Sequence, residues 1–138
     1  MHPTPLASAK AGLAYGLIVF AIGFALGAIR VLAVAPRVGA TAAVTLEAPI
    51  MLAASWKTAT FCIARFGVAA TIRVRIAMGL VAFATLTAGE LGLSLLAFGR
   101  PLADFLQGYA TLPGLIGLAA QVAFAMIPLI RLAAAERR

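Results

Sequence analysis

The chain is poor in charged residues and in the residue types that most metal and redox sites require. Only 11 % of its 138 residues are charged, and it contains one cysteine and one histidine. A lone Cys62 can form neither an intramolecular disulfide nor a cysteine-based metal site. His2 lies beside the N-terminus, which excludes a histidine-held haem or zinc ion within the membrane. No nucleotide-binding loop or catalytic triad is present, so we expect a non-enzymatic protein with no cofactor and no metal.

Apolar residues dominate what remains. Hydrophobic residues make up 64 % of the chain and charged residues only 11 %. In a soluble domain about 25 % of the residues are charged, and they face water. The net charge of +7 would suggest nucleic acid in a soluble protein. Here the basic residues lie mostly at the ends of apolar segments, where they set membrane topology and contact anionic lipids. The composition therefore predicts an integral membrane protein in contact with membrane lipids, and no nucleic-acid partner.

Four apolar segments reach the length of about 20 residues that a membrane-spanning helix needs. Their limits are roughly 12–34, 41–63, 76–98 and 113–132. The short connections favour antiparallel neighbours. We predict one all-α domain over residues 1–138, an up-down bundle of four transmembrane helices, with a turn at Pro36–Gly39. The connection at 99–112 is expected to form a short helix at the outer membrane surface.

Lysine and arginine predict the orientation, because they are enriched on the cytoplasmic side of membrane proteins. Three basic residues fall on one side, namely Arg30, Arg37 and Arg100, and eight on the other, namely Lys10, Lys57, Arg65, Arg73, Arg75, Arg131, Arg137 and Arg138. Both termini are therefore expected in the cytoplasm. Four of these residues (Lys57, Arg65, Arg73, Arg75) form a predicted basic collar, which either sets topology or binds lipid headgroups or an acidic partner.

Each predicted helix carries one polar residue in the outer half of the membrane, and these residues are Arg30, Glu47, Glu90 and Gln121. Charged side chains inside a bilayer usually face protein or water. At about 100° per residue, each of the four lies on the face of its helix that is rich in small residues. We expect an Arg30–Glu47 ion pair, with Glu90 and Gln121 completing one network. One arginine against two carboxylates also predicts that one carboxyl binds a proton, with Glu90 as the candidate.

Glycines and prolines mark expected helix contacts and kinks. Two GxxxG pairs, Gly12/Gly16 and Gly23/Gly27, lie on the same face as Arg30 and predict close approach of a neighbouring helix. Pro49 and Pro128 lie inside predicted helices. Each proline either kinks its helix and frees a carbonyl for a site, or only shapes the packing.

The polar residues leave three interpretations open: a structural cross-link of the bundle, a ligand or proton site, or a contact with lipid headgroups. The first function that we predict is an accessory or structural subunit of a membrane assembly. The alternative is a small proton-coupled transporter or carrier that acts as a homo-oligomer. The expected partners are accordingly membrane lipids and either a second copy of the chain or a partner membrane protein.

Four stretches carry a family resemblance: GFALGAIRVLAVAPRVG, LEAPIMLAASW, MGLVAFATLTAGELGLSLL and LAAQVAFAMIPL. Together they resemble small uncharacterised four-helix proteins of the bacterial inner membrane. The resemblance implies a location in the bacterial inner membrane, and it implies no particular activity. Small multidrug-resistance transporters also have four short helices and a membrane glutamate. Their essential glutamate is in the first helix, where this chain carries Arg30.

Overall fold

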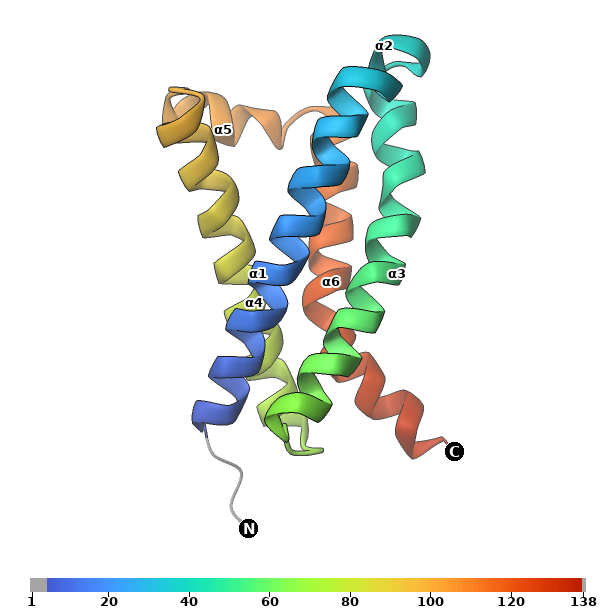
Figure 1. Cartoon of the computed structure of the whole chain (residues 1–138), viewed down its shortest axis with the longest axis vertical. Helices are drawn as coiled ribbons and strands as arrows, with labels where there is room; N and C mark the ends of the chain where they lie inside the picture. Colours follow the sequence, from blue (N-terminus) through green and yellow to red (C-terminus); the bar gives the residue numbers. More distant parts are fainter. Residues whose placement is uncertain (1–4, 138) are drawn as a thin grey trace.

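The computed structural model describes residues 5–137, and within this range it is an all-α bundle, as predicted. Its long helices are α1 (Pro5–Ile29), α3 (Ala40–Phe66), α4 (Ile72–Gly92) and α6 (Leu112–Glu136). Two short helices, α2 (Ala35–Val38) and α5 (Leu102–Gly108), lie at the end of the bundle opposite the termini (Figure 1). Two π-helical turns, Arg30–Val34 and Leu93–Ala97, continue α1 and α4 towards that end.

The helix boundaries differ from the predicted ones at both ends of the chain. The first helix begins at Pro5 rather than at residue 12, and the last continues to Glu136 rather than 132. The predicted turn at Pro36–Gly39 is also largely helical, and the chain reverses at Gly39, whose φ of +89° favours glycine. Hydropathy marks the apolar run, whereas proline at a first turn and alanine-rich ends extend a helix beyond that run.

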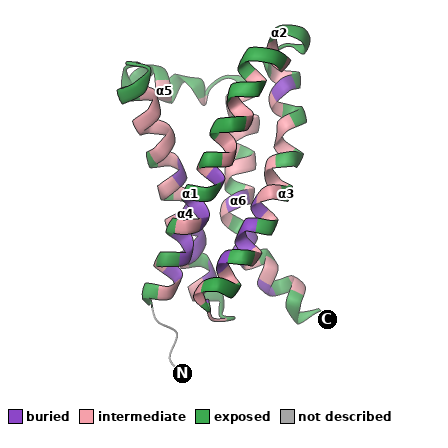
Figure 2. Ribbon diagram, viewed as in Figure 1, coloured by how far each residue is buried: buried purple, intermediate pink, exposed green. Residues whose placement is uncertain are grey.

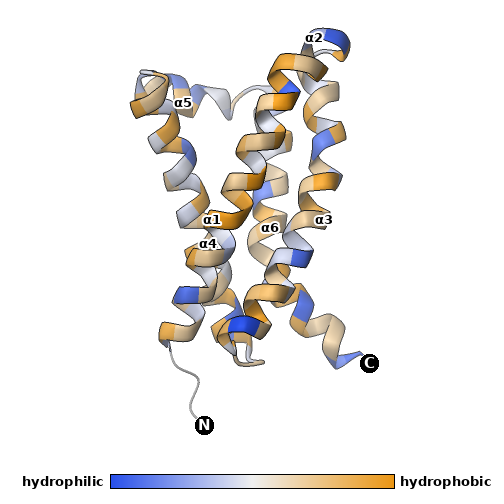
Figure 3. Cartoon of the chain, viewed as in Figure 1, coloured by the Kyte–Doolittle hydropathy of each residue, from blue (hydrophilic) through white to orange (hydrophobic). Residues whose placement is uncertain are grey.

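Three helical segments are long and apolar enough to cross a membrane: Pro5–Val38, Ile72–Ala97 and Leu112–Glu136. The remaining predicted span, 41–63, forms helix α3, which contains Glu47, Lys57 and Arg65 and is not among the three. Figure 3 shows that hydrophobic and near-neutral residues cover most of the long helices, with hydrophilic residues near their ends and at a few positions along them. Length and composition thus indicate a multi-pass membrane protein with three candidate spans.

The buried core lies mainly in the half of the bundle that is nearer the termini (Figure 2). Two predicted packing glycines of α1 make this half compact. A Cβ atom on Gly12 would lie 2.6 Å from the Met78 carbonyl oxygen, and one on Gly16 would lie 2.8 Å from the Ala82 carbonyl oxygen. Only glycine therefore allows α1 to approach the backbone of α4 so closely.

The other half of the bundle is less tightly packed. One turn further along α1 from Gly16, the large side chain of Phe20 lies between α1 and α4. Its ring would be 3.0 Å from a Cβ atom added to Gly89 of α4. Figure 1 shows that α4 diverges from α1 and α3 towards α5. The glycine contacts of α1 with α4 and the Phe20 ring beyond them accompany a bundle that widens towards α5, and this wide end leaves space between the helices.

One member of the predicted basic collar is buried. Arg75 is 7 % exposed, and its guanidinium donates hydrogen bonds to the carbonyl oxygens of Ala69 (3.2 Å) and Pro128 (3.0 Å). Arg75 therefore joins α4 to α6 and does not belong to an exposed collar. Both described chain ends lie at the same end of the bundle (Figure 1), whereas His2 and Arg138, about which the sequence made predictions, lie outside the described residues.

Candidate functional site: a polar cavity at the open end of the bundle

A cavity of about 740 Å³ occupies the open half of the bundle. Helices α1, α3, α4 and α6 form its walls, and residues of α5 and of both π turns contribute to its wide end. All four polar residues singled out from the sequence line it, namely Arg30, Glu47, Glu90 and Gln121. Its volume lies in the range of about 300–1,000 Å³ that is usual for small-molecule sites.

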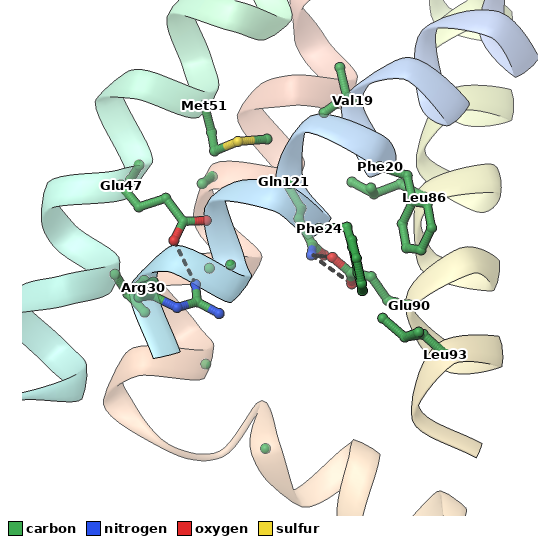
Figure 4. A pocket seen from close by; sticks show the side chains of 18 of the residues that line it. Val19, Phe20, Phe24, Arg30, Glu47, Met51, Leu86, Glu90, Leu93 and Gln121 are labelled. Carbon is green, nitrogen blue, oxygen red and sulfur yellow. Dashed lines mark hydrogen bonds and ion pairs between the residues drawn. The ribbon is translucent and has the colours of Figure 1, made fainter. Parts of the chain in front are cut away.

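The expected ion pair between Arg30 and Glu47 is present in the structure. The Arg30 Nη1 atom lies 3.0 Å from the Glu47 Oε2 atom, and the side chains are 31 % and 15 % exposed (Figure 4). Arg30 is the first residue of the π turn after α1, and Glu47 lies in the second turn of α3. The pair therefore links the two helices of the first hairpin and neutralises both charges at one wall of the cavity.

Glu90 and Gln121 form a second pair, between α4 and α6 (Figure 4). The Gln121 Nε2 atom donates to both carboxylate oxygens of Glu90, at 2.7 and 2.8 Å. An amide nitrogen that faces both oxygens fits an ionised carboxylate, which only accepts hydrogen bonds. The expectation that Glu90 binds a proton stays a prediction. The Gln121 Oε1 atom is then buried without a hydrogen-bond donor among residues 5–137. The expected single network thus consists of two pairs on different helices.

The two π turns lie at this cavity. In the first, the Ala35 N–H donates to the Arg30 carbonyl, and in the second the Phe98 N–H donates to the Leu93 carbonyl. Pro36 is the second residue after the first turn, and it lacks the N–H that regular α-helical bonding would need there. π turns inside α-helices are rare and occur frequently at functional sites. Here the first carries Arg30, and the second begins three residues after Glu90.

Helix α5 and the residues after it contribute aromatic side chains to the cavity. The rings of Phe105 and Tyr109 pack edge to face, with centroids 5.4 Å apart, and both residues line the cavity. The other residues of α5 are exposed. Burial raises the pKa of the Tyr109 phenol, and the Glu90 carboxylate raises this pKa further. The expected short helix at 99–112 is therefore present, and it places a phenol within the electrostatic reach of Glu90.

The second GxxxG pair lies in the cavity wall. A Cβ on Gly23 would have only the terminal methyl of Met51 near it, at 3.4 Å. The nearest atom to a Cβ on Gly27 would be Arg30 Nη2, at 3.7 Å. Gly23 and Gly27 therefore leave space beside α1, whereas Gly12 and Gly16 bring α1 against α4.

The two internal prolines lie outside the cavity lining. Pro128 is buried in the compact half, and it leaves the Phe124 carbonyl, four residues earlier, without an intrahelical N–H. The Tyr15 hydroxyl donates to that carbonyl at 2.7 Å. Pro49 is exposed on α3. The carbonyl that Pro128 frees is thus used in packing, by a tyrosine that the sequence argument did not single out.

Sequence reasoning also missed the aromatic lining of the cavity. Phe20 and Phe24 are spaced as neighbours on one face of α1, and they alternate with Gly23 and Gly27. That spacing was a usable signal, because large and small residues on one helix face give an uneven surface. The part contributed by Phe98, Phe105 and Tyr109 depends on the path of α5, for which the sequence offers no comparable periodicity.

Within residues 5–137, no group of three or more histidine, cysteine or acidic side chains is placed to hold a metal ion. The resemblance to small bacterial inner-membrane proteins stays a prediction. No protein-family model, curated protein or solved structure gives a significant match to this chain.

Proposed function

We propose that this chain is an integral membrane protein that binds a small ligand with an apolar body in the cavity between its helices. One observation carries the proposal: the polar residues in the outer half of all four long helices line the same apolar space. Polar groups that serve only as cross-links are normally packed, because protein interiors contain few voids larger than a water molecule. A cavity of about 740 Å³ beside both pairs is instead the arrangement of a binding site.

The proposal includes a fourth membrane crossing by α3. Its 27 residues are about 40 Å long, which exceeds the hydrocarbon thickness of about 30 Å. It packs against α1 and α6, both of which are apolar enough to span. Glu47, which lowers its hydropathy, is paired with Arg30, and the exposed Lys57 can extend its ammonium towards the membrane surface. The positive-inside rule then places both termini in the cytoplasm, and the resemblance suggests a bacterial inner membrane.

A carrier is the form of this function that agrees with the charged cavity. It would work as a homo-oligomer, because four helices enclose little more than one site. An accessory or structural subunit is the second candidate. It is supported by the fact that each polar pair joins two helices, α1 to α3 and α4 to α6. Neither candidate requires enzyme chemistry or a cofactor.

The test is ligand binding to the full chain in lipid nanodiscs, followed by fluorine NMR. The probes share a 4-(4-fluorophenyl)butyl body and differ in headgroup: amine, alcohol or carboxylate. Gly117→Phe fills the cavity, since Gly117 lines it and a Cβ there would meet no atom within 4 Å. Leu115→Phe is the matched control, because Leu115 is exposed on the same helix and lies outside the cavity lining.

We expect saturable binding of at least one probe, beyond its partition into empty nanodiscs. The affinity should fall at least tenfold in Gly117→Phe and stay within twofold in Leu115→Phe. Absence of saturable binding for all three headgroups, or equal binding by the cavity-filled variant, contradicts the proposed ligand site and favours the accessory role.

A further inference from the structure

We infer that the cavity selects ligands that carry a protonated amine, which would bind at Glu90 and Gln121 with the apolar body against the aromatic walls. This inference rests on the proposed function, since it names the chemistry of the ligand that the cavity would take. It follows from three features of the site: a carboxylate without a cation in contact among the described residues, a free hydrogen-bond acceptor and ring-lined walls.

The charges that line the cavity are unevenly matched. Arg30 and Glu47 neutralise one another at 3.0 Å. Glu90 has only a neutral amide, that of Gln121, within hydrogen-bond distance among the described residues. Arg100 also lines the cavity but is exposed, so solvent and salt screen its charge. The carboxylate of Glu90 is therefore the group for which a cationic ligand would supply the missing charge.

The hydrogen-bonding groups at Glu90 also favour a donor. The two carboxylate oxygens can each accept more than one hydrogen bond, and the buried Gln121 Oε1 has no donor among residues 5–137. An ammonium group has three N–H donors and no acceptor, so it complements these oxygens. A calcium ion would need six to eight oxygen ligands, whereas two side chains supply three oxygens here.

The walls around this position are suited to a cation with an apolar body. Phe20 lies against Gly89, the residue before Glu90, and Phe24 lines the same cavity. Phe105 and Tyr109 complete the wide end. Aromatic faces attract ammonium groups, and the attraction grows when water is excluded. An anionic ligand has no equivalent site, because it would have to displace Glu47 from Arg30 or bind the exposed Arg100.

The experiment compares the three fluorinated probes on the unaltered protein in nanodiscs at neutral pH, where the amine is cationic and the acid anionic. We expect the amine to bind at least tenfold more tightly than the alcohol, and the acid to bind least tightly. In Glu90→Gln the amine should lose its advantage over the alcohol, while alcohol binding persists. Asp104→Asn is the matched control, since this exposed acid on α5 lies outside the cavity lining, and it should keep the preference within twofold.

Equal affinities for amine and alcohol, or tightest binding of the acid, would overturn the inference while the ligand site itself stands. The same holds if Glu90→Gln folds and retains the full amine preference. The ranking in the unaltered protein requires no substitution, so it decides the question even where Glu90→Gln does not fold. Absence of saturable binding for every probe would instead contradict the proposed function and this inference together.

Discussion

The Tyr15 hydroxyl donates a 2.7 Å hydrogen bond to the carbonyl oxygen of Phe124, the group that Pro128 deprives of its intrahelical donor. The two rings also pack together, with centroids 4.3 Å apart. Tyr15 is fully buried on α1, so the contact ties the start of the chain to α6. A proline inside a helix is thus accommodated by a side chain from another helix, which agrees with how membrane helices tolerate proline.

Tyr15→Phe should lower the free energy of unfolding by about 1 kcal/mol, because a buried carbonyl loses its donor. The measurement is thermal unfolding in detergent micelles, followed by circular dichroism. Tyr109→Phe is the control, since Tyr109 lies outside the buried core. In a Pro128→Ala background, residue 128 supplies its own N–H to Phe124, so the same tyrosine substitution should have a smaller effect. Equal losses in both backgrounds would refute this account.

The Tyr109 phenol should ionise at a higher pH than an ordinary tyrosine, because burial and the Glu90 carboxylate both raise its pKa. Removing the negative charge with Glu90→Gln should lower that pKa. Phenolate absorbance during an alkaline titration measures it, in a Tyr15→Phe background where Tyr109 is the remaining one of the two tyrosines. An unchanged midpoint in Glu90→Gln would mean that the carboxylate exerts no field at Tyr109.

Gly79→Ala should destabilise the bundle by about 1–3 kcal/mol through overpacking. A Cβ on Gly79 would collide with the Ala125 carbonyl oxygen, so α4 and α6 would have to separate. Gly92→Ala is the matched control on α4, because no atom lies within 4 Å of the added carbon. That substitution should be neutral, or stabilising by up to about 1 kcal/mol, since alanine favours helix. Chemical unfolding in micelles measures the stability of both variants. Similar stabilities would contradict the close contact between Gly79 and the Ala125 carbonyl.

Arg30→Met should destabilise the fold by about 1–3 kcal/mol, because the Glu47 carboxylate is left without its cation in a largely enclosed position. The adjacent cavity and the 31 % exposure of Arg30 keep the loss below that of a fully buried pair. Adding Glu47→Met should recover part of the loss, because no charge then remains unpaired. Thermal unfolding of both single variants and the double variant gives the interaction free energy between Arg30 and Glu47. Simple additivity would show that the pair does not interact.

Arg75→Lys should lower stability by about 1–2 kcal/mol, because a single ammonium cannot reproduce the two directions in which the guanidinium donates. The Ala69 and Pro128 carbonyls that accept these bonds come from different segments of the chain. Arg73→Lys is the control with the same chemical change, since Arg73 is exposed two residues earlier. Unfolding in denaturant should separate the two variants, and equal midpoints would argue against a structural role for Arg75.

Several elements of the bundle could be predicted from the sequence because they depend on local periodicity. Helical spacing placed Arg30, Glu47, Glu90 and Gln121 on inward faces, and the structure brings all four to one cavity. The Arg30–Glu47 pair was predicted as well. The separation of Glu90 and Gln121 into a second pair was not predictable, since it depends on how far α4 diverges from α1. The same limit applies to Arg75: its charge fits a cytoplasmic collar, and only the packing of α4 on α6 shows that it is buried.

The two GxxxG pairs illustrate the limit of a motif. Gly12/Gly16 and Gly23/Gly27 share a spacing and a helix face, yet the first pair meets the backbone of α4 and the second meets only the ends of the Met51 and Arg30 side chains. What differs is the partner, because α4 crosses α1 near Gly12 and Gly16 and has moved away before Gly23. A crossing angle is a tertiary property, and a spacing of four residues does not encode it.

The close crossing of α1 and α4 at Gly12 and Gly16 has a mechanical consequence. It acts as a fixed pivot, because glycine contacts and buried side chains leave little freedom at that depth. A small tilt of either helix about this point would change the width of the opposite end. The amides around the pivot should therefore resist hydrogen exchange, while those beside the cavity exchange faster.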